Sequence, residues 1–378
     1  MSCLQRIITL IYSSFTMIKI CDITELPEID KSVIDYMEKK KHEKVIFCSD
    51  TTTNLKAIIA IHNTSLGPAL GGTRMWNYNN ISEATKDVLR LSRGMTYKAS
   101  ITGLQLGGGK AVIIGDSKNK TAEMMRSFGK FVESQNGQYI TAEDVGMTTH
   151  DMEMIHKETN HVVGKPIKLG GSGDPSPVTA YGVLMGMKGS AFHKWGSDNL
   201  RGKKVLVQGV GNVGRNLIEL LNNEEAEIWV NEINPEKLGK IADDYDVKII
   251  SENIYAADVD IYAPCALGGT LNEKTIPMLK CAIVAGGANN QLAKENIHDD
   301  LLIKHNILYA PDFLINAGGL INVYSELKGF SNQQVKEKTE TIFDTTIEIL
   351  KKSESENISS QKAALKIAKN KISKTHKS

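Results

Sequence analysis

Residues 203–232, which read KKVLVQGVGNVGRNLIELLNNEEAEIWVNE, decide the fold class of this chain. The apolar run at 203–208 predicts a strand, and a G-x-G-x-x-G pattern follows it directly at 209–214. A helix is expected over 216–221 and a second strand over 227–230, with Glu232 just beyond its end. In such a frame, the glycines and the helix N-terminus hold a pyrophosphate while the acid accepts a hydrogen bond from ribose. The stretch therefore predicts a dinucleotide site.

The predicted dinucleotide site has a defined set of residues and one cofactor preference. Glu232 favours NAD over NADP, because its carboxylate would repel the extra phosphate of NADP. The residues expected at the pyrophosphate are Gly209, Val210, Gly211, Asn212, Val213 and Gly214.

Three later apolar runs, at 260–263, 282–285 and 307–309, each lead into a loop rich in turn-forming residues. Together with the first two strands they predict a doubly wound sheet, whose loops line its carboxyl edge. Asn289 and Asn290, in the loop after the second run, are candidates to bond the nicotinamide amide or the substrate. A plain loop role is the alternative for either asparagine.

Composition points to a protein that acts on small molecules. The chain has 378 residues, a length that suits two domains. Its 45 Lys and Arg nearly balance its 44 Asp and Glu, so there is no large net charge to attract nucleic acid or a membrane surface. The five cysteines form no Cys-x-x-Cys pair, and the nine histidines complete no His-Glu-x-x-His pattern. We therefore expect a reducing compartment and no metal site.

The first sixteen residues are mildly apolar and carry no acid. They are too short to span a bilayer and lack a small-residue cleavage site. Either they form a weak organelle-targeting leader, or translation starts at Met17.

Two lysines in the first half of the chain are candidates for chemistry. Apolar residues recur at helical spacing from Ala84 to Met95 behind an expected cap at Ser82, and Lys98 takes the next position on that stripe. The glycines at 107–109 are expected to form a loop, and Lys110 follows them directly before an apolar strand expected over 111–114. Burial and mutual repulsion favour a neutral amine, so one lysine could act as a base while the other binds an anion. Two surface lysines beside a flexible loop are the alternative.

Further polar and glycine positions follow expected strands. Strands over 45–48 and 55–61 lead to Gly71 and Gly72, which could present main-chain N–H groups to a ligand or form a tight turn. After a helix at 121–135, another strand ends near Asp144, where an acid could exchange a proton with a substrate amine. A helix cap is the alternative for this acid.

The remaining segments organise the chain around these motifs. Turn-forming residues at 169–176 predict a hinge between domains, and an Ala- and Gly-rich helix is expected over 178–191. A helix start is expected within 313–323. The Lys-rich tail at 333–378 is expected to be helical, either with a solvated face or packed onto the first domain or a neighbouring subunit.

Taken together, these motifs closely resemble the amino-acid dehydrogenases of the Glu/Leu/Phe/Val family, and their leucine-type members in particular. The likeness runs from about Met17 to the tail in the family's order. The motifs are GPALGGTRM from Gly67, MTYK from Met95, LGGGK from Leu106, TAEDVG from Thr141, PSPVTAYG from Pro175, GVGNVG from Gly209, APCALGG from Ala263, ANNQL from Ala288 and NAGGLINV from Asn316.

The resemblance implies an α/β fold of two domains and an NAD-dependent oxidative deamination of an L-amino acid to a 2-oxo acid and ammonium. It implies a substrate-binding and oligomerisation domain at 17–165, a Rossmann NAD-binding domain at 166–350, and a helical segment at 351–378 that returns to the first domain. A cytoplasmic homo-oligomer acting in branched-chain amino-acid catabolism is expected.

The resemblance also assigns roles to matching positions. Lys110 would be the general base, Asp144 would exchange protons with the amine, and Lys98 would bind the substrate carboxylate. Substrate would also contact Gly71, Gly72, Met95 and Asn290, and its side chain would enter a pocket of Leu70, Ala142, Leu320 and Val323. The nicotinamide end would be held by Thr179, Asn289, Cys265 and Ala266.

Substrate choice is the open point of the resemblance. Leu320 replaces the valine usual in leucine-type members and is seen in phenylalanine-type ones. The alternatives are a phenylalanine- or valine-preferring dehydrogenase, and a catalytically silent NAD-binding regulatory protein. Intact Lys110 and Asp144 speak against the silent protein, which has no need of either.

Overall fold

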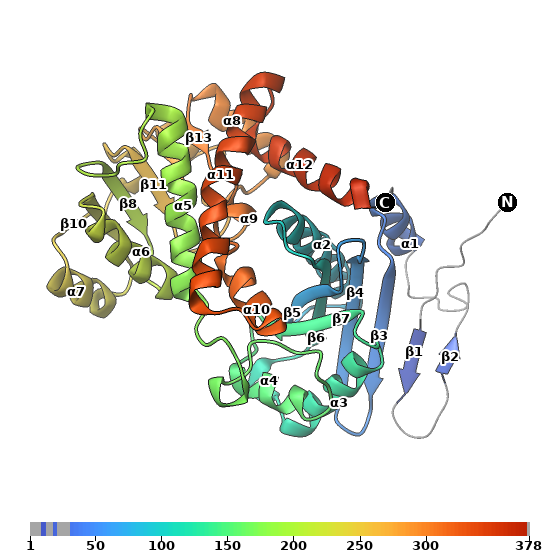
Figure 1. The fold of residues 1–378 in the computed structure, drawn as a ribbon. Coiled ribbons are helices and arrows are strands. Elements are labelled where there is room, and N and C mark those ends of the chain that lie inside the picture. Colours follow the sequence, from blue (N-terminus) through green and yellow to red (C-terminus); the bar gives the residue numbers. More distant parts are fainter. Residues whose placement is uncertain (1–8, 13–17, 21–30, 376–378) are drawn as a thin grey trace. The chain divides into compact units, whose positions relative to one another are not determined.

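The structure is a computed structural model that describes residues 9–12, 18–20 and 31–375 (Figure 1). The expectations about a leader and a start at Met17 fall largely outside these ranges. No helix in the described part of the chain is long and apolar enough to cross a membrane.

Two units divide the chain between Gly173 and Asp174, and from Lys371 onward the chain belongs to the first unit again. We refer to them as unit 1 and unit 2. The functional limits expected from the sequence, 17–165, 166–350 and 351–378, stay predictions.

Unit 1 is built on a seven-stranded mixed sheet in the order β2-β1-β3-β4-β6-β5-β7. The strands β3, β4 and β6 pair antiparallel, whereas β5 runs parallel to both β6 and β7. The strands are β1 (Thr9–Tyr12), β2 (Ile18–Ile20), β3 (Lys44–Asp50), β4 (Leu55–Asn63), β5 (Ala69–Trp76), β6 (Gly107–Ile114) and β7 (Tyr139–Glu143).

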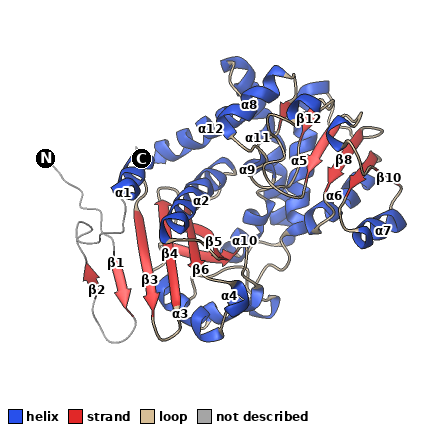
Figure 2. Cartoon of the chain, turned by 180° about the vertical axis from the view of Figure 1, so that it is seen from behind, coloured by secondary structure: helices blue, strands red, loops and turns tan. Residues whose placement is uncertain are grey.

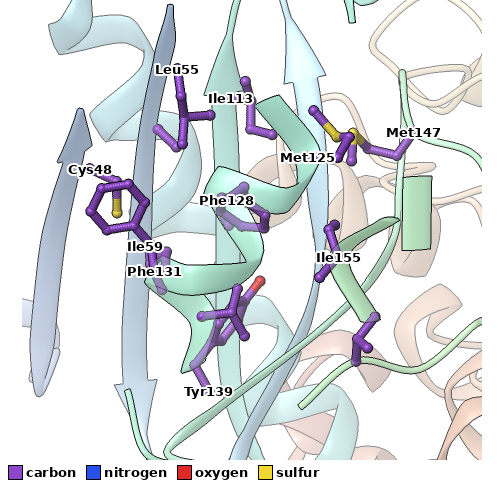
Figure 3. Packing of buried hydrophobic residues seen from close by; sticks show 14 of the residues in the cluster. Cys48, Leu55, Ile59, Ile113, Met125, Phe128, Phe131, Tyr139, Met147 and Ile155 are labelled. Carbon is purple, nitrogen blue, oxygen red and sulfur yellow. The ribbon is translucent and has the colours of Figure 1, made fainter. Parts of the chain in front are cut away.

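Helices cover both faces of the unit 1 sheet, as Figures 1 and 2 show. On one face, α1 (Lys31–Lys40) and α2 (Ile81–Ile101) pack on alternate strand residues such as Ile58 and Val112. On the other, α3 (Ala122–Glu133) and α4 (Thr149–His156) pack on residues such as Ile59 and Ile113, as Figure 3 shows for the cluster beneath α3. Because both faces are buried, β4 and the second half of β6 read as nearly continuous apolar runs rather than alternating ones.

The start of α2 differs from the sequence prediction. Asn80, not Ser82, is the N-cap, and its side chain accepts a hydrogen bond from the Glu83 N–H. The expected buried stripe also drifts: Val88 is buried, but Met95 and Lys98 are only half-buried. A second row from Thr85 through Leu89, Ser92 and Thr96 is buried instead, because 3.6 residues per turn rotate the contact face along a long helix.

Unit 2 contains a six-stranded, fully parallel sheet in the order β10-β9-β8-β11-β12-β13. This is the doubly wound order, in which the chain reverses direction across the sheet between β8 and β11, and it confirms the predicted Rossmann fold. The strands are β8 (Lys204–Gln208), β9 (Glu227–Asn231), β10 (Val247–Ile249), β11 (Ile261–Pro264), β12 (Ile283–Val284) and β13 (Leu308–Tyr309). The sequence did not predict β10, an edge strand of partly exposed residues.

The helices of unit 2 include the expected ones at 178–191 and 216–221, which are both longer than predicted, and two at 235–244 and 295–304 that were not predicted from the sequence. They are α5 (Ser176–Trp195), α6 (Asn212–Asn223), α7 (Pro235–Asp244), α8 (Glu295–Lys304), α9 (Asp312–Ile315), α10 (Gly318–Lys328), α11 (Asn332–Glu356) and α12 (Ser360–Thr375). Short 3₁₀ turns lie at Ser117–Asn119 and Ile167–Leu169 in unit 1 and at Ile254–Ala256 and Ile276–Met278 in unit 2. The expected helix at 216–221 is α6, which begins inside the glycine motif.

The tail is helical, as predicted, and it buries an apolar row. In α11, Ile342 and Ile349 are buried against the helices that α11 contacts, α5, α9 and α10. Near the end of α12, the Lys371 ammonium donates to the carbonyl oxygen of Ile101, the last residue of α2, over 3.3 Å. The expected return of the tail to the first domain stays a prediction.

The cluster beneath α3 provides a test of what holds unit 1 together. Phe128 is fully buried at its centre, so Phe128→Ala should lower the free energy of unfolding by about 3 to 5 kcal/mol. Ile167, which is 75% exposed, supplies the control, because Ile167→Ala should change it by less than about 0.5 kcal/mol. Urea titration followed by circular dichroism measures both, and equal losses would contradict this assignment of the core.

Candidate active site

The centre of the site is an ion pair between Lys110 and Asp144 in unit 1. Lys110 lies within β6, and its ammonium donates a hydrogen bond to Asp144 Oδ2, just after the end of β7. Lys110 is only 6% exposed, so the alternative of a surface lysine is wrong for this residue. The two residues are 34 positions apart in sequence, and the fold brings them together because β6 and β7 both flank β5.

The pair has an electrostatic environment that perturbs both groups. Burial lowers the pKa of Lys110, and the opposing charge of Asp144 offsets only part of this effect, so the pKa lies below its ordinary value. Burial alone would raise the pKa of Asp144, but the cations Lys110 and Arg74 outweigh it and hold this pKa below its usual range. Lys110 is thus poised to lose a proton more easily than a surface lysine, while Asp144 stays ionised.

Arg74 on β5 links this pair to a second acid. Its Nε lies 3.4 Å from Asp144 Oδ2, and its Nη1 lies 3.0 Å from Asp87 Oδ2 on α2. Asp87 also accepts from the Tyr78 hydroxyl at 2.8 Å and from Arg90 at 3.0 Å. A cavity of about 560 Å³ lies beside this chain of charges and is lined by Arg74, Trp76, Tyr78, Glu83, Lys86, Asp87, Arg90 and Val145.

Neither Arg74 nor Asp87 was predicted from the sequence. Its distance from Gly72 could have indicated Arg74. Residues two positions apart in a strand point to the same face, so Arg74 lies on the face of β5 that Gly72 occupies. Asp87 had no such signal, since a lone acid on a helix usually faces solvent.

Gly71 and Gly72 lie inside β5 and beside the ion pair, rather than in a turn. A Cβ on Gly71 would stand 1.7 Å from the carbonyl oxygen of Gly109, so only glycine allows β5 and β6 to approach here. A Cβ on Gly72 would stand 3.0 Å from Cβ of Asp144. The register between β5 and β6 skips from Leu70–Gly108 to Thr73–Ala111, which leaves Gly71 and Gly72 without register partners in β6.

The glycines at 107–109 also differ from the prediction. They form the first part of β6 instead of a loop before it, so Lys110 stands within a strand and not at its mouth. Tyr139 packs over Gly109 and donates its hydroxyl to the Gly71 carbonyl at 2.6 Å. This contact fixes the backbone beside the ion pair.

The other predicted substrate residues are distributed over both units. Lys98 and Met95 are half-buried on α2, which packs against β6. Leu70 and Ala142 are buried in unit 1, whereas Leu320 is buried and Val323 half-buried on α10 of unit 2. Whether these four line one pocket stays a prediction.

The glycine motif of unit 2 forms an open cradle at the end of β8. Gly209 has φ +96°, and a Cβ there would stand 2.7 Å from Cβ of Ala266. Gly211 is the N-cap of α6 without any side-chain cap, and no atom lies within 4 Å of where its Cβ would be. A free helix N-terminus with open space beside it fits a pyrophosphate group. The residues present therefore fit a dinucleotide.

Glu232 lies where a ribose-binding acid is expected. It follows β9, and its carboxylate accepts from the backbone N–H of Val210 at 2.7 Å and of Asn234 at 2.9 Å. Although burial raises the pKa of Glu232, these N–H donors lower it to a net value below the usual range. The carboxylate is thus charged and fixed against the glycine turn.

The residues predicted at the nicotinamide end all belong to unit 2. Asn289 is exposed, and its side-chain oxygen accepts from Asn316 at 2.8 Å; Asn290 is exposed with φ +53°. Cys265 follows β11, and its Sγ accepts from the Gly287 N–H at 3.4 Å. Thr179, in the first turn of α5, donates its hydroxyl to the Pro175 carbonyl at 2.9 Å.

Comparison with known protein families shows which family the chain belongs to. Residues 42–161 match the family model of the Glu/Leu/Phe/Val dehydrogenase dimerisation domain, and residues 170–231 and 227–378 match that of glutamate/leucine/phenylalanine/valine dehydrogenase. The chain belongs to this family. It is therefore an oxidoreductase with a nicotinamide cofactor.

Individual members of the amino-acid dehydrogenase family are similar over most of the chain. Leucine dehydrogenase of Bacillus subtilis is 50% identical over 345 residues, which cover 91% of this chain and 94% of that protein. Phenylalanine dehydrogenase of Caldalkalibacillus thermarum is 44% identical, covering 91% and 94%. The crystal structure of L-tryptophan dehydrogenase from Nostoc punctiforme has a TM-score of 0.83 at 43% identity, covering 91% of this chain and 100% of that one.

Among the described residues, no group of three or more His, Cys, Asp or Glu side chains is placed to hold a metal ion. The expected absence of a metal stays a prediction.

The glycine motif gives two substitutions with different expected results. Gly211→Ala should leave the urea midpoint unchanged, because its Cβ meets no atom, and should weaken NADH binding at least about tenfold by filling the cradle. Gly209→Ala should lower the midpoint itself, because the positive φ and Ala266 both oppose a side chain. NADH fluorescence titration and urea denaturation measure the two effects. A Gly211→Ala protein that binds NADH normally would refute the cradle.

Proposed function

We propose that this chain catalyses the reversible NAD-dependent oxidative deamination of branched-chain L-amino acids, with leucine preferred and isoleucine and valine accepted. The products are the 2-oxo acid and ammonium. The observation that carries the proposal is the buried Lys110–Asp144 pair beside Gly71 and Gly72, in a chain 50% identical to a leucine dehydrogenase.

Lys110 is proposed as the general base. Deamination requires a water molecule to be deprotonated as it attacks the oxidised α-carbon, and an amine with a lowered pKa does this near neutral pH. Burial lowers the pKa of Lys110, which supports this role, and we assign to the ionised Asp144 the exchange of a proton with the substrate amine. The carboxylate of the substrate is assigned to Lys98 together with the backbone of Gly71 and Gly72.

The cofactor is proposed to be NAD, which when bound accepts a hydride from the substrate α-carbon. Gly209 to Gly214 and the start of α6 would hold the pyrophosphate, and Glu232 would accept from the ribose hydroxyls. A charged Glu232 supports NAD, since the extra phosphate of NADP would lie against a carboxylate. Thr179, Asn289, Cys265 and Ala266 are assigned to the nicotinamide end.

The side-chain pocket is proposed to consist of Leu70, Ala142, Leu320 and Val323. An apolar pocket separates substrates that differ by one methylene by only about 1 to 3 kcal/mol, so activity on leucine, isoleucine and valine should overlap. Leu320 supports a second candidate, a phenylalanine-preferring enzyme, as does the similarity to a phenylalanine dehydrogenase.

Assembly and location follow as parts of the same proposal. The match to a dimerisation-domain model supports a homo-oligomer. The near balance of 45 basic and 44 acidic residues supports a small-molecule substrate and neither nucleic acid nor a membrane as partner. Scattered cysteines support the cytoplasm.

The reaction is tested by a panel of Leu, Ile, Val, Phe, Trp and Glu with NAD, followed by NADH absorbance at alkaline pH. We expect leucine to have the highest kcat/KM. Lys110→Ala should lower kcat about 100-fold to 10,000-fold, because it removes the base. Lys188, which pairs with Glu224 at 2.9 Å in unit 2, provides the control, and Lys188→Ala should retain activity.

The panel also separates the rival functions. A preference of about tenfold or more for phenylalanine would replace the leucine assignment with the phenylalanine type. A folded protein that binds NADH but produces none from any amino acid would favour the silent regulatory protein.

The cofactor preference is tested at the end of β9. Glu232→Gln removes the charge but keeps the shape, so the ratio of kcat/KM for NAD over NADP should fall at least about tenfold. Glu227 begins the same strand and pairs with Lys248 at 2.7 Å, so Glu227→Gln should leave that ratio unchanged. An unaltered ratio in Glu232→Gln would argue against the assigned role of this acid.

A further inference from the structure

We propose that Arg74 is a positioning residue for the Lys110–Asp144 pair, and that Asp87 controls how strongly Arg74 acts on it. The proposal rests on the function proposed above, in which Lys110 is the base. It concerns a chain of charges, Asp87–Arg74–Asp144–Lys110, which runs from α2 through β5 to the loop after β7 and then to β6.

Arg74 stands between two carboxylates and is bound more closely by the outer one. Its Nη1 donates to Asp87 at 3.0 Å, whereas its Nε is 3.4 Å from Asp144. That Nε is buried and has no hydrogen-bond partner among the described residues. The guanidinium therefore attracts the Asp144 carboxylate by its charge and forms no hydrogen bond with it through Nε. The hydrogen bond to Asp144 Oδ2 comes from Lys110 instead.

Asp87 is itself held in place on its outer side. The Tyr78 hydroxyl donates to Asp87 Oδ2 at 2.8 Å, and Arg90 donates to Oδ1 at 3.0 Å. With these partners, Asp87 draws the guanidinium away from Asp144. Because an arginine side chain presents its donors as a rigid fork, loss of Asp87 would free that fork to close on Asp144.

The charges around Lys110 predict in which direction its pKa moves when Arg74 or Asp87 is replaced. The groups that act on it are Asp144 after β7, Arg74 on β5 and Asp87 on α2, the helix that also carries Lys98. Removing Arg74 takes away a nearby cation and leaves Asp144 to Lys110 alone, and both changes favour the protonated amine. Removing Asp87 has the opposite result, because it takes away an anion and turns Arg74 toward Asp144.

A purely structural role for Arg74, as a tie between β5 and α2, predicts something else. Breaking either end of the same ion pair would then lower stability in both variants and leave the pH dependence of the reaction in place. The direction of the pH shift is therefore the readout that separates positioning from structure.

The experiment measures kcat/KM for leucine against pH in Arg74→Gln, Asp87→Asn and Arg74→Lys. We expect the acid limb, where Lys110 gains its proton, to move up by about one pH unit in Arg74→Gln and down in Asp87→Asn. Arg74→Lys keeps the charge and should restore most of the wild-type profile. Arg126→Gln breaks another arginine ion pair of unit 1, with Glu158 at 2.6 Å, and should leave the profile unchanged.

A double variant tests the coupling between the two residues. If Asp87 acts mainly through Arg74, Asp87→Asn should move the limb less in the Arg74→Gln background than alone. Shifts in the same direction in both single variants, or none in either, would overturn the proposal. If Arg74→Gln does not fold, Asp87→Asn and Tyr78→Phe, which loosens Asp87, still give the downward shift or refute it.

A second readout keeps this proposal distinct from the proposed function. The rate at which a small acylating reagent labels Lys110, followed by peptide mass spectrometry across pH, reports the protonation of this amine without catalysis. Its midpoint should rise in Arg74→Gln and fall in Asp87→Asn. A wild-type chain inactive on every amino acid would defeat the proposed function alone, whereas unmoved labelling midpoints would defeat the role of Arg74.

Discussion

The buried contact between Lys110 and Asp144 is the constraint on which the first unit depends. A lysine inside a strand that is covered on both faces is costly to keep charged without a partner, and so is a half-buried carboxylate just after a strand of the same sheet. Removing one member of such a buried pair typically costs about 3 to 5 kcal/mol, because the other charge stays desolvated. Each charge therefore stabilises the other in the folded protein, and the loss of either one leaves its partner buried and uncompensated.

Two of the charged groups, Arg74 on β5 and Lys110 on β6, stand within strands, and Asp144 directly follows a third strand, β7. Close approach of β5 and β6 at Gly71 and Gly109 brings the two carriers of charge, Arg74 and Lys110, onto adjacent strands. Groups on a paired sheet are held more rigidly than groups on loops. The second unit follows a related plan, since Glu232 and the turn at Gly209 sit at the carboxyl ends of neighbouring parallel strands.

Much of this could be predicted from the sequence because the signals are local. The glycine turn and Glu232 lie within one short segment, and Lys110 and Asp144 stand next to apolar runs that predict strands. Three features could not be predicted from the sequence: the cap at Asn80, the strand β10 and the ion pair between Arg74 and Asp87. Neighbouring polar residues compete equally for a cap, an exposed edge strand has no apolar pattern, and an ion pair between elements depends on how they pack.

The contact of Lys371 with the carbonyl end of α2 gives the last turns of the chain a structural task. A cation at that end neutralises the partial negative charge of unbonded carbonyls, which otherwise promotes fraying. Proteolytic trimming before Lys371, or a bulky affinity tag fused close behind it, would leave those carbonyls to solvent. Preparations with different C-termini are then not equivalent samples of the same enzyme.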